Sequence, residues 1–250
     1  MKRFFLLLAI VATCSIASVS QPYHYDVDGN GVVTAADVTA LYNYLLGNVP
    51  EVNYEWVDLG LPSGTLWATM NVGACSPEEY GDYFAWGETK PKEWYAWSTY
   101  QWCNGTENTL TKYCTKRSFG YNGFVDGKTK LDLEDDPAFV NWGPEWRMPS
   151  LEQIEELYDN CTLVWTKLNG VKGRLFTASN GASLFLPAAG FRWEGTLYSA
   201  DYSGYYWSRK LDITEPYFTF CLYFNPSVMY WDGSYREYGY SVRAVRVVQN

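Results

Sequence analysis

Oxygen-bearing side chains are spaced through residues 26–37, DVDGNGVVTAAD, in a pattern suited to holding a metal ion. Counted from Asp26, they fall at positions 1, 3, 5, 9 and 12, and position 7 can offer its backbone carbonyl. Gly31 at position 6 supplies the sharp turn that such a loop needs. Calcium takes about six to eight oxygen ligands, and carboxylates offset its charge. We therefore expect a calcium site formed by Asp26, Asp28, Asn30, Val32, Thr34 and Asp37. The alternative is an ordinary Asp/Gly turn.

The residues after this loop are expected to form an amphipathic helix that stops near Gly47, with Val38, Leu41, Tyr42 and Leu45 on one face. Loop and helix together have EF-hand spacing, and residues 21–47 resemble a single calcium-binding repeat of a dockerin. The resemblance implies a cohesin-type partner and a place in extracellular polysaccharide degradation. A dockerin has two such repeats and this sequence shows one, so calcium binding follows more directly than cohesin docking.

The first twenty residues read as a signal peptide, because Lys2 and Arg3 precede the apolar run FFLLLAIVA and small residues surround a cleavage point after Ser20. A competing interpretation is a lipoprotein anchored through Cys14. Later residues contain no apolar run of the roughly 18 residues that a transmembrane helix needs. We expect a secreted or cell-surface protein with no transmembrane segment.

The net charge argues against one class of partner, and the cysteine count limits the possible disulfides. The chain has a formal net charge of -9, and removing Lys2 and Arg3 leaves it more acidic, which argues against nucleic acid as a partner. Beyond Cys14 five cysteines remain, so an oxidising compartment leaves at least one thiol unpaired. Cys103 and Cys114 are the closest pair and the candidate disulfide.

A linker is expected over residues 48–54, followed by one domain over residues 55–250. Ser150 can cap a helix that buries Leu151, Ile154, Leu157 and Tyr158, with Gln153 completing a capping box. Asn180-Gly181 between two apolar runs predicts a β-hairpin, and the run YFTFCLYF over residues 217–224 predicts a buried strand. Segregated strands with few helices indicate an α+β fold.

Six separated blocks of this domain are similar to the Fibrobacter succinogenes major paralogous domain: VDLGLPSGTLWATMNVGA, EEYGDYFAWGETKPK, WRMPSLEQIEEL, LPAAGFR, GYYWS and GYSVRAVR. Two of them, WRMPSLEQ and GYSVRAVR, also resemble the formylglycine-generating-enzyme version of the C-type-lectin fold. The resemblance implies a loop-rich, C-type-lectin-like domain whose N- and C-terminal strands pair. It does not carry over that enzyme's chemistry, because the closely spaced reactive cysteines are missing and Cys221 stands alone.

No catalytic set is evident in the large domain, which contains no histidine. A carboxylate pair of a glycosidase could come from Glu134, Asp135, Asp136, Glu145 and Glu194, but no spacing singles one out. The segment LEDDP reads as a solvated turn, with a second calcium site as the alternative.

Aromatic residues are concentrated between Tyr198 and Tyr240, where they fill fifteen of 43 positions among Gly, Ser, Asp and Asn. Rigid rings beside adaptable polar groups suit the recognition of sugars or protein surfaces. The candidate ligand-binding residues are Trp193, Tyr198, Tyr202, Tyr230, Trp231 and Tyr235. The leading hypothesis is a secreted, non-catalytic binding or adhesion protein for a glycan or surface protein. The alternatives are a dockerin-bearing component of polysaccharide degradation and a structural cell-surface component.

Overall fold

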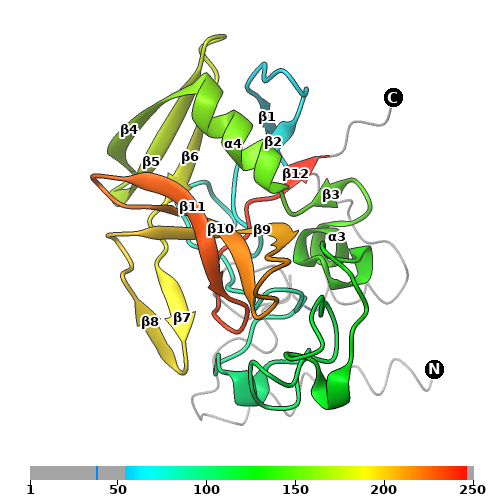
Figure 1. Cartoon of the computed structure of the whole chain (residues 1–250). Helices are drawn as coiled ribbons and strands as arrows, with labels where there is room; N and C mark the ends of the chain where they lie inside the picture. The colour runs from blue at the N-terminus through cyan, green and yellow to red at the C-terminus, as the bar shows by residue number, and fades with distance from the viewer. Residues whose placement is uncertain (1–37, 39–53, 247–250) are drawn as a thin grey trace, which may run out of the picture. The chain divides into compact units, whose positions relative to one another are not determined.

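The structure, a computed structural model, describes residue 38 and residues 54–246 (Figure 1). The chain divides into two units, residues 1–52 and 53–250, and residues 54–246 belong to the second. The expected signal peptide, the calcium loop over residues 26–37 and nearly all of the linker lie outside the described residues. Those three assignments stay predictions.

Short antiparallel strands form most of the second unit. Four sheets have the strand orders β1-β2-β12-β3, β11-β10-β9, β4-β5-β6 and β7-β8. The strands are β1 (Trp56–Asp58), β2 (Leu66–Ala68), β3 (Trp146–Arg147), β4 (Cys161–Leu168), β5 (Val171–Ala178), β6 (Ser183–Pro187), β7 (Phe191–Trp193), β8 (Thr196–Tyr198), β9 (Gly204–Leu211), β10 (Phe218–Phe224), β11 (Met229–Tyr235) and β12 (Val245–Arg246). With two α-helices in residues 54–246, α3 (Pro137–Trp142) and α4 (Leu151–Asn160), this is the expected loop-rich α+β architecture.

Helix α4 begins where its sequence predicts. The Ser150 hydroxyl accepts a hydrogen bond from the Gln153 backbone N–H at 3.2 Å, and the Gln153 side chain accepts one from the Ser150 N–H at 2.9 Å. Leu151, Ile154 and Leu157 are buried as expected. Tyr158 was expected to be buried with them and shares their face, but it is 38% exposed in the last turn of the helix, where its ring packs 5.8 Å from that of Trp231.

The predicted hairpin around Asn180 and Gly181 is confirmed as the connection between β5 and β6. Gly181 adopts a φ of 84°, a left-handed conformation that favours glycine. The Asn180 side-chain oxygen accepts a hydrogen bond from the Ala182 N–H at 2.9 Å. Local turn chemistry therefore determines this register.

Strand β10 is buried between β9 and β11, which explains why its sequence is apolar on both faces. Leu222 and Phe224 join a core cluster with Ile154 and Leu157 of α4. Cys221 and Trp207 of β9 join a second cluster on the other face. The buried strand expected over residues 217–224 is thus confirmed.

The two ends of the second unit meet in one sheet, because β12 pairs with both β2 and β3. This pairing of early and late strands agrees with what the resemblance implies. Within the described residues, β12 begins only at Val245, later than the run GYSVRAVRVV suggests, because the preceding residues cross the core. Among them Val242 and Ala244 are buried, and Arg243 donates to the carbonyls of Ala68 and Thr69.

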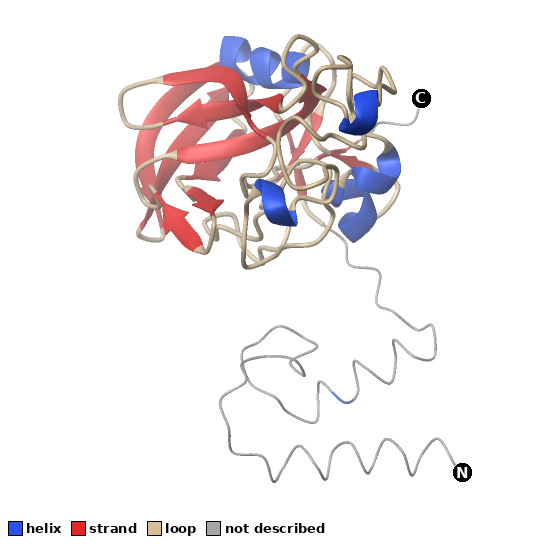
Figure 2. Cartoon of the chain, turned by 60° about the horizontal axis from the view of Figure 1, so that its bottom comes forward, coloured by secondary structure: helices blue, strands red, loops and turns tan. Residues whose placement is uncertain are grey.

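Residues 69–145 connect β2 to β3 without a strand among the named elements of this segment, and Figure 2 shows such loops gathered away from the strands. The segment contains α3 and three 3-10 turns, η1 (Trp97–Thr99), η2 (Tyr121–Gly123) and η3 (Leu133–Asp135). The fully buried Arg236 holds these loops, since its guanidinium donates to the Tyr100 hydroxyl and to the carbonyls of Tyr113 and Lys112. The long loops of residues 69–145 are thereby held in fixed positions.

Candidate ligand-binding site

Two exposed tryptophans flank the place where the β7–β8 hairpin meets residues 92–97. The Tyr95 N–H donates to the Glu194 carbonyl at 3.0 Å, and the Glu194 N–H donates to the Tyr95 carbonyl at 2.7 Å. Trp94 is 51% exposed and Trp193 is 39% exposed. Figure 1 shows this hairpin projecting from the body of strands. Large indole rings left in water beside a backbone junction suggest a contact surface.

Two glycines allow residues 92–97 to lie in close contact with the β7–β8 hairpin and with residue 239. A Cβ added at Gly195 would meet the Trp94 ring at 3.3 Å, so the indole lies directly against the hairpin turn. A Cβ added at Gly239 would lie 2.6 Å from the Tyr95 ring, which real Cβ atoms essentially never do. The Arg192 N–H donates to the Gly239 carbonyl at 2.8 Å and ties the hairpin to the same backbone.

A cavity of about 430 Å³ opens beside this junction. Its volume falls within the range of about 300–1,000 Å³ that small-molecule sites occupy. The lining comes from two neighbouring segments and from the distant β7–β8 hairpin: Gly81, Asp82, Tyr83, Pro91, Lys92, Glu93, Tyr95, Arg192 and Gly195. We refer to this lining as the hairpin cleft.

Two buried tyrosines form a rigid part of the hairpin cleft. The Tyr83 hydroxyl donates to the Ala189 carbonyl at 2.5 Å, and the Tyr95 hydroxyl donates to the Tyr83 carbonyl at 2.5 Å. Burial raises the pKa of Tyr95 to about 12 and raises that of Tyr83 as well. Both phenols are therefore neutral near pH 7 and are held in place by the backbone.

Lys92 brings a cationic group that is already paired. Its Nζ lies 2.7 Å from the Glu88 carboxylate and donates to the Thr99 carbonyl at 3.0 Å. Glu88 is buried and also accepts a hydrogen bond from the Gln101 N–H at 2.7 Å. This pair fixes the segment that carries Trp94 and leaves little free positive charge at Lys92.

Asp82 and Arg192 bring opposite charges to the hairpin cleft, which the exposed Glu93 also lines. Within residues 54–246 neither side chain forms an ion pair or a side-chain hydrogen bond. The Arg192 guanidinium lies 5.2 Å from the centre of the Tyr83 ring, and burial raises the pKa of Asp82. One acceptor-only group and one donor-only group thus remain available to a ligand.

Three of the six predicted ligand-binding rings lie near this cleft. The Trp193 ring centre is 6.0 Å from that of Tyr198 and 6.2 Å from that of Tyr238. Tyr238 in turn lies 5.6 Å from Tyr235. The structure therefore brings Trp193, Tyr198 and Tyr235 into one aromatic group through a ring that the sequence did not single out.

The other three predicted rings do not extend that group as one surface. Tyr230 reaches it only through intervening rings, beginning with Tyr223 at 4.9 Å. Trp231 lies on the opposite side of β11 from its neighbour Tyr230, since side chains alternate along a strand. Its ring packs 5.8 Å from that of Tyr158 in α4. Tyr202 is 57% exposed but has no ring partner in the described part of the chain.

Sequence reasoning missed Trp94 and the charged residues of the hairpin cleft. The cue was present in the run KEWYAW over residues 92–97, where two charged residues are followed by three aromatic residues. This run lies about one hundred residues before the hairpin that it joins. The Tyr95–Glu194 backbone pairing connects the two segments, and no local spacing signals it.

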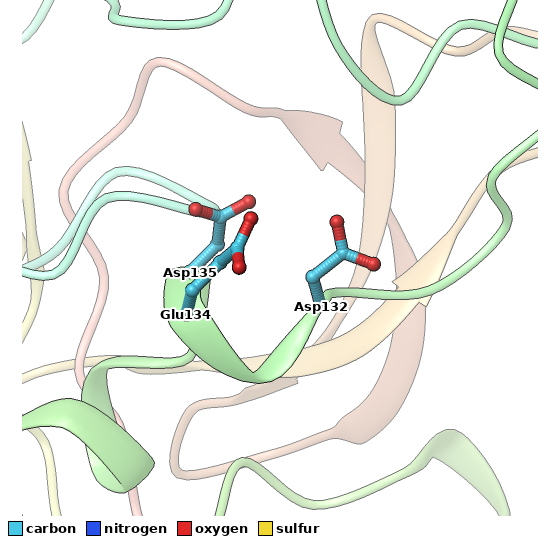
Figure 3. A group of neighbouring side chains, drawn as sticks. All are labelled: Asp132, Glu134 and Asp135. Carbon is cyan, nitrogen blue, oxygen red and sulfur yellow. The ribbon is translucent and has the colours of Figure 1, made fainter.

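The segment LEDDP, whose alternative interpretation was a second calcium site, overlaps an acidic group at η3. Asp132, Glu134 and Asp135 surround one turn (Figure 3), but the Lys112 Nζ lies 3.0, 3.2 and 2.7 Å from their carboxylates. Burial opposes the charge of Lys112, and hydrogen bonds to these three carboxylates raise its pKa despite that. The Lys112 ammonium group thus already pairs with all three carboxylates.

The segment LEDDP is not the solvated turn that was expected. Asp135 and Asp136 are 5% and 2% exposed. Asp136 caps α3 by accepting from the Ala138 N–H at 2.9 Å, and it also accepts from the Met148 N–H at 2.8 Å. These carboxylates are used in holding loops together.

The disulfide expected between Cys103 and Cys114 is not formed in this structure. All five cysteines of residues 54–246 are free thiols. The Cys103 Sγ donates to the Trp97 carbonyl at 3.1 Å, and the Cys114 Sγ donates to the Lys116 carbonyl at 3.1 Å. Each thiol is directed to its own loop, which sequence proximity alone does not reveal.

Comparison of this chain with protein-family models, with curated proteins and with solved structures finds no match. None of the helices in the described residues is long and apolar enough to cross a membrane. The functional argument therefore rests on the geometry of the hairpin cleft and the rings beside it.

Proposed function

We propose that this protein is a secreted or cell-surface, non-catalytic binding protein that recognises a glycan or a surface protein. The observation that carries the proposal is the pair of exposed indoles, Trp94 and Trp193, fixed on either side of the Tyr95–Glu194 junction beside a polar cavity. Aromatic faces provide contact area at low entropic cost, and neighbouring polar groups orient the ligand.

The groups that define the cleft are suited to binding. Its tyrosines are held neutral, its lysine is paired with Glu88, and the Asp82 and Arg192 side chains are open to hydrogen bonding. Such a set recognises hydroxyl and amide groups, which glycans and protein surfaces both offer.

The same proposal includes a family for the large domain and a role for the N-terminal repeat. The large domain would be a Fibrobacter succinogenes major paralogous domain with a C-type-lectin-like fold, which the six sequence blocks and the β2–β12 pairing support. The repeat over residues 26–47 would bind calcium and serve as an attachment or stiffening element after export. Its support is the spacing of ligands from Asp26 to Asp37.

A second function, a dockerin-bearing component of polysaccharide degradation, is favoured by that repeat alone. It predicts capture by a cohesin module, measured by pull-down with and without calcium.

The leading function is tested by a glycan-array screen of the purified protein, run once with calcium and once with a chelator. Specific binding of one glycan class is the expected result, and calcium dependence would assign the repeat a supporting role. A blank array together with no captured surface protein would contradict a binding function.

A further inference from the structure

Among the charged groups that line the hairpin cleft, Asp82 and Arg192 are of opposite sign and have no ion pair or side-chain hydrogen bond within residues 54–246. The Asp82 carboxylate only accepts hydrogen bonds, and the Arg192 guanidinium only donates them. They are not within ion-pair distance of each other, although both line one cavity of about 430 Å³. A ligand that occupies this cavity must offer donors to one group and acceptors to the other.

We propose that the hairpin cleft binds a neutral pyranose residue of a glycan, with adjacent hydroxyls donating to Asp82 and accepting from Arg192 and with Trp94 contacting the glycan at the rim of the cleft, beside Gly195. This inference rests on the proposed binding function and names its ligand class. A hydroxyl is both donor and acceptor, so two neighbouring hydroxyls satisfy both side chains at once. Hydrogen bonds to charged groups are stronger than neutral ones, which gives the site its orientation.

Trp94 lies outside the cavity lining and provides an exposed aromatic ring at its rim. Its indole is 51% exposed and rests on the backbone of Gly195, a lining residue of the cleft. One face of a pyranose ring carries mainly C–H groups, and an exposed aromatic face can cover them at low entropic cost. Because the Lys92–Glu88 pair holds the segment before Trp94, the ring needs little ordering when a ligand binds.

The charge balance of the cleft favours a neutral sugar over an acidic one. Lys92 is neutralised by Glu88, which leaves Arg192 as the free cation among the lining residues. Asp82 and the exposed Glu93 line the same cavity, and the whole chain has a net charge of -9. A carboxylate on the ligand would meet like charges at close range, which costs affinity.

The test measures saccharide binding to the purified exported protein by saturation-transfer NMR and titration calorimetry. The probes are methyl glycosides and short oligosaccharides of glucose, galactose and mannose, with the matching glucuronic and galacturonic acid compounds. Two cleft variants, Asp82→Asn and Arg192→Gln, are compared with Asp159→Asn and Arg117→Gln, which change exposed residues elsewhere. Melting temperatures establish that all four variants fold.

The expected result is that a neutral probe binds at least about tenfold more tightly than its uronic acid counterpart. Each cleft variant should lower the affinity about tenfold or more, as expected when a charge-assisted hydrogen bond is lost, while the two controls bind as wild type.

Three results would overturn the inference. Saccharide binding that survives unchanged in both folded cleft variants would leave the binding function intact and place the ligand elsewhere. A preference for the uronic acid probes would reject the neutral class. Absence of binding to every saccharide would reject this inference and the glycan form of the proposed function together.

Discussion

Tyr95 and Glu194, almost one hundred residues apart, lie opposite each other and exchange two backbone hydrogen bonds of 3.0 and 2.7 Å. This pairing joins a long loop to the β7–β8 hairpin and leaves Trp94 and Trp193 exposed beside the cleft. The proposed binding surface therefore depends on a long-range contact rather than on a local motif.

The close contact between Gly195 and Trp94 predicts that Gly195→Val weakens ligand binding without unfolding the protein. The added Cβ would lie 3.3 Å from the indole, so the ring must move from its present position. We expect affinity to fall about two- to tenfold, the equivalent of roughly 0.5–1.5 kcal/mol for an aromatic contact. Calorimetric titration checks this, with Gly233→Val as the matched control in β11. Equal affinities for both variants would show that the position of Trp94 is immaterial.

Replacing Arg236 is predicted to lower the stability of the protein strongly. Its buried guanidinium donates to the Tyr100 hydroxyl at 2.9 Å and to the Pro216 carbonyl at 2.8 Å, and it lies 5.1 Å from the centre of the Trp86 ring. Arg236→Met leaves these buried acceptors unpaired, so we expect the free energy of unfolding to fall by about 3–5 kcal/mol.

Urea denaturation measures that loss, and Arg192→Met provides the comparison. The Arg192 guanidinium has no hydrogen bond within residues 54–246, so its removal should change the free energy of unfolding by less than about 1 kcal/mol. Similar values for the two variants would mean that Arg236 does not hold the loops.

The buried Glu237 carboxyl is predicted to make the stability of the protein depend on pH. Its carboxyl is 5% exposed with one oxygen unpartnered, and burial raises its pKa to about 8, with Glu107 adding to the rise and Lys92 opposing it. The folded state therefore holds this proton more strongly than the unfolded state, whose pKa is near 4.5. Stability from this group is full below about pH 4.5 and is lost as the pH rises towards 8.

Glu237→Gln should remove that loss, so the variant gains melting temperature relative to wild type at pH 8 more than at pH 5. Thermal melts across this pH range check the prediction, with the exposed Glu55→Gln as a control that leaves the slope unchanged. A wild-type slope retained in Glu237→Gln would assign the pH dependence to another group.

Calcium binding is predicted to reside in the N-terminal repeat. Asp28→Ala removes a carboxylate ligand and should abolish calcium binding measured by titration calorimetry. Asp132→Asn should leave it unchanged, because the Lys112 Nζ already lies 3.0 Å from the Asp132 carboxylate. Loss of calcium binding in Asp132→Asn alone would reverse this assignment.

Elements with local signals were predictable from the sequence. Ser150 and Gln153 mark the start of α4, and Asn180-Gly181 marks a hairpin, because caps and turns depend on neighbouring residues. The apolar run in β10 indicated burial on both faces.

The candidate site was predictable only in part. Trp193, Tyr198 and Tyr235 were identified by ring density, but that density did not distinguish Tyr230 from Trp231 on opposite sides of β11. Trp94 was missed because its position depends on the distant pairing of Tyr95 with Glu194.

The measurement that tests the central claim most directly compares ligand binding by the wild-type protein and by a Trp94→Ala, Trp193→Ala double variant. The ligand is taken from the glycan-array screen, and Trp56→Ala, which removes another exposed tryptophan, is the control. We predict that the double variant loses the ligand, with affinity lowered at least about tenfold, while its melting temperature and the binding of the control stay near wild type. Undiminished binding by a folded double variant would contradict the account.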